Sequence, residues 1–415
     1  MRRRLALERS TPLWLSLRFF VTAPLFMLLA GAVLLWQGPQ LFASRWSPGA
    51  LAATHLVTLG VLTMVIAGAL LQLLPVVGGV EVAFPALTAP AVHLSLCAGT
   101  LLLAGGFCLA QPLLFQLALP ALLLALLWLL TACGAGLWRA PPGVVDALLS
   151  GVRVALLSLF VTLLLGAAMA SAFAWPLALP LQRLADLHAL WGLSGWIGVL
   201  VVAIAYQVIP MFQVTPLYPA GLTRALCRAM LLLMLAASAA GLAGHAGATW
   251  LHGLLLAGFT LFALVTLRLL AKRKRPAPDA TTLFWRTSMG SLLACAALWY
   301  APLDENVRAI LLGLLFMLGF AYSAVVGMLY KIVPFLLWQH WQEMNFGKPV
   351  PSIRLIVTEN AARAQFASHL AALLMLAAAA LWPQQLARAA ALALLASTLG
   401  LAWILWRALH LGPPD

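Results

Sequence analysis

The sequence has very few charged residues for its length. Of 415 residues, 10 are Asp or Glu and 24 are Lys or Arg, so only 8% are charged, while 64% are hydrophobic and the mean hydropathy is +1.03. A soluble domain needs roughly a quarter of its residues charged to cover its surface. This shortage excludes a water-soluble globule, a disordered chain and a collagen-like protein. It predicts a protein that crosses a membrane several times.

Clustered thiols and buried carboxylates are also scarce. The five cysteines, Cys97, Cys108, Cys133, Cys227 and Cys295, lie in or beside apolar runs and form no CxxC pair. They are interpreted as small core residues, which disfavours both a disulfide scaffold and a thiolate metal site. No carboxylate is expected in the middle of an apolar run, which disfavours a pump or ion-coupled transporter built on a central acid.

Apolar runs long enough to cross a bilayer, about 20 residues each, occur twelve times. They are roughly 15–36, 51–74, 91–110, 117–138, 150–172, 187–210, 224–243, 249–271, 284–301, 306–330, 364–382 and 385–408. We therefore expect an all-α integral membrane protein, with residues 1–415 forming a single polytopic domain in the lipid bilayer.

The net charge of +14 is explained by orientation. If Met1 to Arg4 lie in the cytoplasm, the other side of the membrane has only Arg45, Arg183, Arg308 and Arg388, and the remaining basic residues are cytoplasmic. This predicts cytoplasmic termini in a bacterial-type inner membrane and no nucleic-acid partner. A polybasic contact of Lys272–Arg275 with anionic lipid is the alternative for that run.

Three of the runs end alike. Gln72 and Pro75, Gln207 and Pro210, and Lys331 and Pro334 each enclose two aliphatic residues, and the long polar residues are 135 and 124 residues apart. Because four spans separate successive copies, all three copies have one orientation. We predict repeats at about 15–138, 150–271 and 284–408, arranged as three four-helix arcs with pseudo-threefold symmetry. The alternative is that proline simply follows helix ends.

Histidines precede two of these polar residues. His55 lies 17 residues before Gln72, and His188 lies 19 residues before Gln207. Both are therefore expected on the non-cytoplasmic side, about one turn into the membrane. The third copy has leucine, Leu312 or Leu314, at the corresponding distance.

This arrangement resembles subunit I of the heme–copper oxidases, and the stretch from His55 to Pro75 looks like the corresponding helix of the NnrS family, their smaller relatives associated with heme, copper and nitrosative stress. The resemblance implies that His55 matches a low-spin heme ligand and that His188 matches a copper ligand. It implies heme b as cofactor, with copper as a second candidate, and a respiratory or electron-transfer partner. The NnrS-type Trp-His-x-His-Glu opening is absent around His55.

The same resemblance argues against oxygen reduction. The oxidases' histidine pair in the seventh helix is missing from 224–243, and the tenth span has no histidine where they place two heme ligands. Copper and a high-spin heme would both lack ligands.

The helical positions of several other residues suggest roles for them. Gly192, Gly195 and Gly198 share the face of His188 and predict either a slot for a porphyrin plane or close helix packing. His252 could join His188 or His55 on a metal, or be an interfacial residue beside Trp250. His369 and His93 are expected to snorkel to the cytoplasmic interface, with a proton-entry or inner metal site as the alternative. Gln72, Gln207 and Lys331 are expected either to line a vestibule or to cap the last carbonyls.

Three functions follow from these observations. The first is a heme-binding membrane protein, without oxygen reduction, in electron transfer or defence against nitrosative stress. The second is a transporter or permease for a metal ion or small molecule, and the third is an accessory or assembly subunit of a respiratory complex. The sequence does not decide whether the protein is an enzyme.

Overall fold

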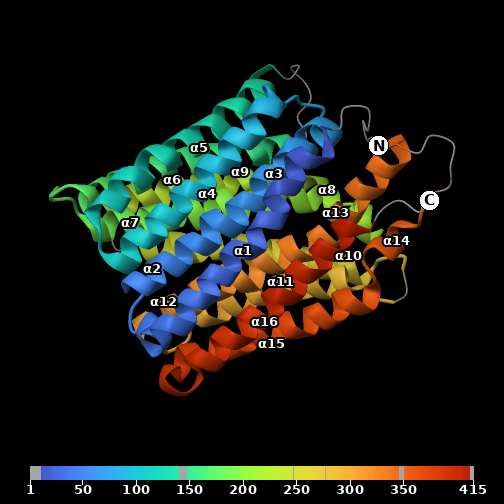
Figure 1. The fold of residues 1–415 in the computed structure, drawn as a ribbon. Helices are drawn as coiled ribbons and strands as arrows, with labels where there is room; N and C mark the ends of the chain where they lie inside the picture. The colour runs from blue at the N-terminus through green and yellow to red at the C-terminus, as the bar shows by residue number, and fades with distance from the viewer. Residues whose placement is uncertain (1–10, 140–146, 246, 276, 345–349, 412–415) are drawn as a thin grey trace. The chain divides into compact units, whose positions relative to one another are not determined.

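The computed structural model describes residues 11–139, 147–245, 247–275, 277–344 and 350–411, and its regular elements in these ranges are all helical (Figure 1). In chain order they are α1 (Leu13–Gln37), η2 (Gly38–Phe42), α2 (Pro48–His55), η3 (Leu56–Thr63), α3 (Met64–Leu73), η4 (Leu74–Gly78), α4 (Pro85–Leu109), α5 (Pro112–Arg139), α6 (Ala147–Ala174), α7 (Leu181–Ala189), η5 (Leu190–Val199), α8 (Leu200–Gln213), α9 (Ala220–Leu242), α10 (Ala248–Ala271), α11 (Ala280–Trp299), α12 (Glu305–Leu314), η6 (Leu315–Tyr322), α13 (Ser323–Met344), α14 (Ile353–Ile356), α15 (Glu359–Leu381) and α16 (Pro383–His410). The segments η3, η4, η5 and η6 are π-helical, and η2 is a 3-10 helix.

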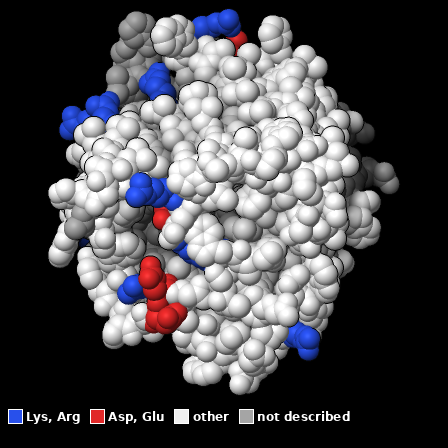
Figure 2. Space-filling model, turned by 90° about the vertical axis from the view of Figure 1, so that its left-hand side faces the viewer, with Lys and Arg blue, Asp and Glu red and all other residues white. Residues whose placement is uncertain are grey.

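Eleven continuous helices in the described ranges are long and apolar enough to cross a membrane. The remaining predicted span corresponds to α11, which is less apolar because it includes Arg286 and several hydroxyl residues. Its 20 residues extend about 30 Å, the thickness of a hydrocarbon core. The prediction of an all-α integral membrane protein with about twelve helices is therefore confirmed. Figure 2 shows how few and scattered the charged side chains are on one face.

The helices that contain Pro210 and Pro334 extend beyond the predicted ends. The predicted spans 187–210 and 306–330 stop at or before these prolines, whereas α8 ends at Gln213 and α13 ends at Met344. A proline removes one backbone hydrogen bond without forcing a helix to end, and membrane helices tolerate it when neighbouring groups compensate. Met1 to Arg4, on which the predicted orientation depends, lie outside the described residues.

The chain forms two compact units. Unit 1 consists of Met1–Thr11, Ala69–Arg275 and Leu292–Ala301, and unit 2 of Pro12–Gly68, Pro276–Ser291 and Pro302–Asp415. In unit 1, α4 packs on α5 and α5 on α6; in unit 2, α16 packs on both α1 and α15 (Figure 1). The predicted middle repeat, 150–271, lies wholly in unit 1, and the other two repeats have segments in both units. The predicted repeat boundaries and the single domain stay predictions.

A π-helical segment recurs in the second, sixth and tenth spans. The segments η3, η5 and η6 follow α2, α7 and α12 directly, and they contain Gly60, Gly195 and Gly319. These glycines are separated by 135 and 124 residues, the same spacings that separate Gln72, Gln207 and Lys331. The glycines of the three π-helical segments therefore repeat with the same spacing as the polar residues Gln72, Gln207 and Lys331.

Each of these glycines touches the preceding long helix of its own unit. A Cβ atom on Gly60 would overlap the ring of Phe26 in α1, and Cβ atoms on Gly195 and Gly319 would overlap Ser158 in α6 and Ser291 in α11. Since any side chain would push the two helices apart, the contact requires glycine at all three positions.

A second contact lies eight residues further along the same three spans. A Cβ atom on Gly68 would lie 2.7 Å from Cβ of Phe19, and one on Gly327 would lie 2.7 Å from Cβ of Phe284. In the middle copy the small residues are exchanged, because Ala203 packs on Gly151. Phe19, Gly151 and Phe284 each precede the first contact by seven residues, which places both contacts on one face of the helix.

We expect Gly319→Ala to destabilise the protein by about 1–3 kcal/mol, because the added methyl group overpacks the contact with Ser291. The measurement is thermal unfolding in detergent. Gly290→Ala, one residue before Ser291, is the matched control, since a Cβ atom there would meet nothing within 4 Å. Equal melting temperatures of the two variants would contradict the assignment.

Candidate functional site

His55 is the last residue of α2, directly before the π-helical segment η3. Its span begins at Pro48, so His55 lies about 10 Å into the helix at 1.5 Å per residue. The half-buried imidazole has Nδ1 2.7 Å from the carbonyl oxygen of Leu51. Because a carbonyl can only accept, Nδ1 is the protonated nitrogen of the neutral ring and the lone pair lies on Nε2.

His188 lies at a similar depth in its own span, two residues before η5. Its Nδ1 donates to the carbonyl oxygen of Thr162 in α6 at 3.0 Å. The imidazole lies over Gly166, where a Cβ atom would be 3.0 Å from Cε1 of the ring. A helix of the same unit therefore holds this ring, and its Nε2 also has the lone pair that a metal ligand requires.

Gly192 and Gly195 face α6. A Cβ atom on Gly192 would lie 3.1 Å from Cγ2 of Thr162, and one on Gly195 would overlap Ser158. Close helix packing, the alternative left open by the sequence, accounts for both glycines. A porphyrin plane on this face would have to displace α6, and the assignment of these glycines to a cofactor stays a prediction.

His252 lies near the start of α10 in unit 1. Its Nδ1 donates to the carbonyl of Ala248 at 2.8 Å, and its ring centroid is 6.3 Å from that of Trp299. Trp250, two residues earlier, is largely exposed. The aromatic surroundings fit an interfacial position. In the described ranges no three His, Cys, Asp or Glu side chains come together as a metal site, and a metal at His252 stays a prediction.

His369 is buried, and the prediction that it snorkels to the interface is wrong. The side chain is 3% exposed, and Nε2 lies 2.8 Å from Oγ of Ser323 in α13. Helix α15 begins five residues before the predicted start of the eleventh span, so the histidine lies two to three turns inside the helix instead of at its end. The rings of Phe284 and Tyr322 lie 5.3 Å and 5.5 Å from its own.

A second buried polar group lies one turn away on α15. The hydroxyl of Tyr330 donates to Oε1 of Gln365 at 2.9 Å, and Nε2 of Gln365 donates to Oγ of Ser397 at 3.2 Å and to the Ser397 carbonyl at 3.3 Å. The sequence offered one sign of this group, since Gln365 and His369 are four residues apart and share a helical face.

Lys331 forms an ion pair, instead of capping the end of its own helix. Its Nζ lies 2.8 Å from Oδ2 of Asp279, the residue before α11. Oδ1 of Asp279 accepts hydrogen bonds from the backbone N–H and the hydroxyl of Thr282, at 2.9 Å and 2.7 Å. Asp279 therefore caps α11 and neutralises Lys331 at once. Burial raises the pKa of the Asp279 carboxyl, but the hydrogen bond and charge of Lys331 and the bonds from Thr282 outweigh burial, so the pKa lies below its ordinary 3.8.

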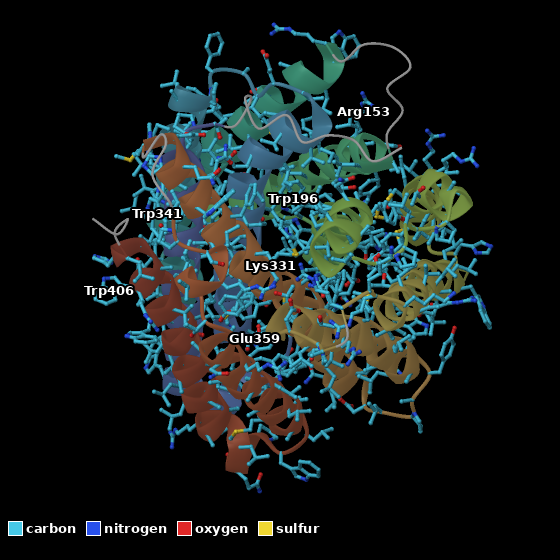
Figure 3. The ribbon with its side chains drawn as sticks, turned by 90° about the vertical axis from the view of Figure 1, so that its right-hand side faces the viewer. Arg153, Trp196, Lys331, Trp341, Glu359 and Trp406 are labelled. Carbon is cyan, nitrogen blue, oxygen red and sulfur yellow. The ribbon has the colours of Figure 1, made fainter. Side chains whose placement is uncertain are left out.

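Glu359 extends this charged group at the start of α15. Its Oε1 accepts from the backbone N–H of Ala280 at 2.8 Å and from Nε of Arg363 at 2.7 Å, and Arg363 also donates to the Pro278 carbonyl. Figure 3 labels Glu359 and Lys331 on their two helices, α15 and α13. Neither Asp279 nor Glu359 was predicted from the sequence, although an Asp directly before a helix start is a capping signal.

Gln72 also bonds outside its own helix, because its Nε2 donates to the carbonyl of Thr11 at 2.9 Å. Next to Gln207, the buried Tyr206 occupies the position that Tyr330 occupies next to Lys331, and its ring lies 5.1 Å from that of Tyr218. The three polar residues of the repeat thus have three different partners or surroundings. No protein-family model and no curated protein matches the chain.

We expect Asp279→Asn to destabilise the protein by about 1–3 kcal/mol at pH 7, since it leaves Lys331 partly buried without its counter-charge. The folded-state pKa of Asp279 is depressed, so its stabilisation is complete above the ordinary pKa of 3.8 and is lost as the pH falls below it. Thermal unfolding of the wild type and the variant should therefore converge in acid.

The matched control for this prediction is Glu343→Gln, which removes an exposed carboxylate from α13 and should cost little. Lys331→Met with Asp279→Asn should cost less than the sum of the single changes, because the two residues interact directly. Additive effects would mean that the pair contributes nothing.

Proposed function

We propose that the chain is a multi-pass membrane protein that binds b-type heme, with the imidazole of His55 in unit 2 and that of His188 in unit 1 each a candidate iron ligand. One observation supports this most directly. In two spans of different units, a histidine at similar depth lies one or two residues before a π-helical segment and donates Nδ1–H to a backbone carbonyl. Each unit thus offers one oriented ring with its lone pair on Nε2.

The surroundings of the two histidines suit iron ligands, but they also restrict where a heme could lie. A backbone carbonyl that accepts from Nδ1 commonly orients a ligating histidine, and π-helical segments are frequent at functional sites. The face of Gly192 and Gly195 is filled by α6. A heme on His188 would therefore lie on another side of η5, and the glycines would act by holding α6 in place.

A bound heme supplies one-electron redox chemistry or reversible binding of a small gas molecule. The residues of this chain would bind, orient and shield it. Leu56 and Val57, which follow His55, are buried. Trp191, three residues after His188, is also buried, and its indole N–H donates to the Ser238 hydroxyl at 2.9 Å. These buried side chains would cover part of a heme bound beside either ring. Electron transfer to a respiratory partner, or a role in nitrosative stress, fits this arrangement better than oxygen reduction, for which the ligands are missing from the sequence.

We expect protein purified from heme-replete cells to show a Soret band and an α band in its reduced-minus-oxidised spectrum. His55→Ala or His188→Ala should abolish or shift these bands, because the substituted ring is an iron ligand. His410→Ala is the control, since His410 is exposed at the end of α16. His252→Ala tests whether that residue takes part.

Colourless, iron-free protein would rule out the heme. Each variant should also elute as the wild type does in size-exclusion chromatography, so that loss of the bands reports loss of a ligand and not of the fold.

A further inference from the structure

A titratable side chain lies near the middle of a membrane-spanning helix in unit 2, and the heme proposal makes no use of it. His369 is ten residues after Glu359 in the 23-residue helix α15, which places it about 15 Å along a helix of about 34 Å. The hydrocarbon core is about 30 Å thick. An ionisable group at this depth is expensive, and such groups mark proton relays and ion pathways.

Ser323 gives the imidazole two possible proton arrangements. Its Oγ lies 2.8 Å from Nε2 of His369 and 3.2 Å from the carbonyl oxygen of Leu318 in η6. A hydroxyl has one hydrogen to donate. When that hydrogen points to Leu318, Nε2 must be protonated to donate to Ser323; when it points to Nε2, the imidazole accepts. Rotation of the hydroxyl, together with gain or loss of the proton on Nε2, therefore interconverts the two arrangements.

Residues of three neighbouring elements face the imidazole of His369. Phe284 comes from α11, Tyr322 from η6 and Ser323 from α13. Thr398 of α16 lies near the hydroxyl of Tyr322 without a well-formed hydrogen bond to it. Tyr322 is thus the titratable neighbour among these residues, and none of the four bears a charge.

Further polar groups extend from His369 toward the end of the helices where α15 begins. Gln365 lies one turn, about 6 Å, nearer that end and is bonded to Tyr330 and Ser397. Tyr330 is followed directly by Lys331, which is paired with Asp279. In unit 2, polar side chains therefore lie at successive levels between the middle of α15 and the ion pair of Lys331 with Asp279, the residue before α11.

We propose that these residues form a one-sided proton-uptake path in unit 2, with His369 as the proton acceptor in the membrane, Tyr330 as a relaying hydroxyl and Asp279 with Lys331 at the entrance. Ser323 orients the imidazole through its contact with Nε2. Gln365 is a positioning residue, because its amide holds the Tyr330 hydroxyl. A bridging water would cross the turn between Tyr330 and His369. A relaying hydroxyl accepts one proton and releases another, and the imidazole becomes an imidazolium until it returns the proton, so no electrons move.

The full chain is tested in detergent by NMR of protein labelled with 15N-histidine, which reports the protonation of each imidazole. The His369 signal, identified by its loss in His369→Gln, should shift with pH, because the imidazole takes up and returns a proton. Tyr330→Phe should slow the exchange of this proton with solvent, and Ser323→Ala should shift the signal. The exposed His410→Gln should leave the His369 signal unchanged.

A His369 signal that does not change with pH would overturn the proposal, and so would an exchange rate that Tyr330→Phe leaves unchanged. Size-exclusion elution and the melting temperature of each variant in detergent separate loss of proton uptake from loss of fold. The outcome does not depend on whether heme is bound.

Discussion

The close contact between a π-helical segment and the preceding long helix is the constraint on which the other features depend. In the second, sixth and tenth spans a glycine touches a neighbouring helix so closely that no side chain would fit, and a second contact follows eight residues later. In a bilayer, where apolar surfaces gain little from leaving lipid, helices associate through such close packing. These contacts decide which face of each span turns inward, and hence which of the few polar side chains are buried.

The absence of water from the hydrocarbon region determines how those polar side chains are satisfied. A buried donor or acceptor without a partner costs several kcal/mol there. His55 forms its hydrogen bond within its own helix, with the carbonyl four residues earlier. His188 and His369 form theirs with residues of other helices. A ring held by another helix has a fixed orientation, and this makes His188 and His369 better placed for chemistry than residues free to turn.

At the helix ends, single acidic residues make several interactions at once. Asp279 both caps α11 and pairs with Lys331, and Glu359 joins the starts of α11 and α15 while pairing with Arg363. With only 10 acidic residues in the chain, two of them stabilise one end of unit 2. The polar groups of α13, α15 and α16 begin at this charged end, so the same residues that hold the helices together also lie where a proton would enter.

Composition and spacing alone determined the membrane class, the approximate spans and the register that links Gln72, Gln207 and Lys331, because transfer into lipid depends on the length and polarity of a run and not on its neighbours. The positions of His55 and His188 relative to those residues were visible for the same reason. Only the tertiary structure decided that α6 fills the face of Gly192 and Gly195, that His369 is buried against Ser323, and that Lys331 pairs with Asp279. Each of these depends on which helix lies opposite a given face. The partners are 30 to 52 residues apart along the chain, as for Gly192 with Thr162 and Lys331 with Asp279, and such separations leave no periodic signal within a single helix.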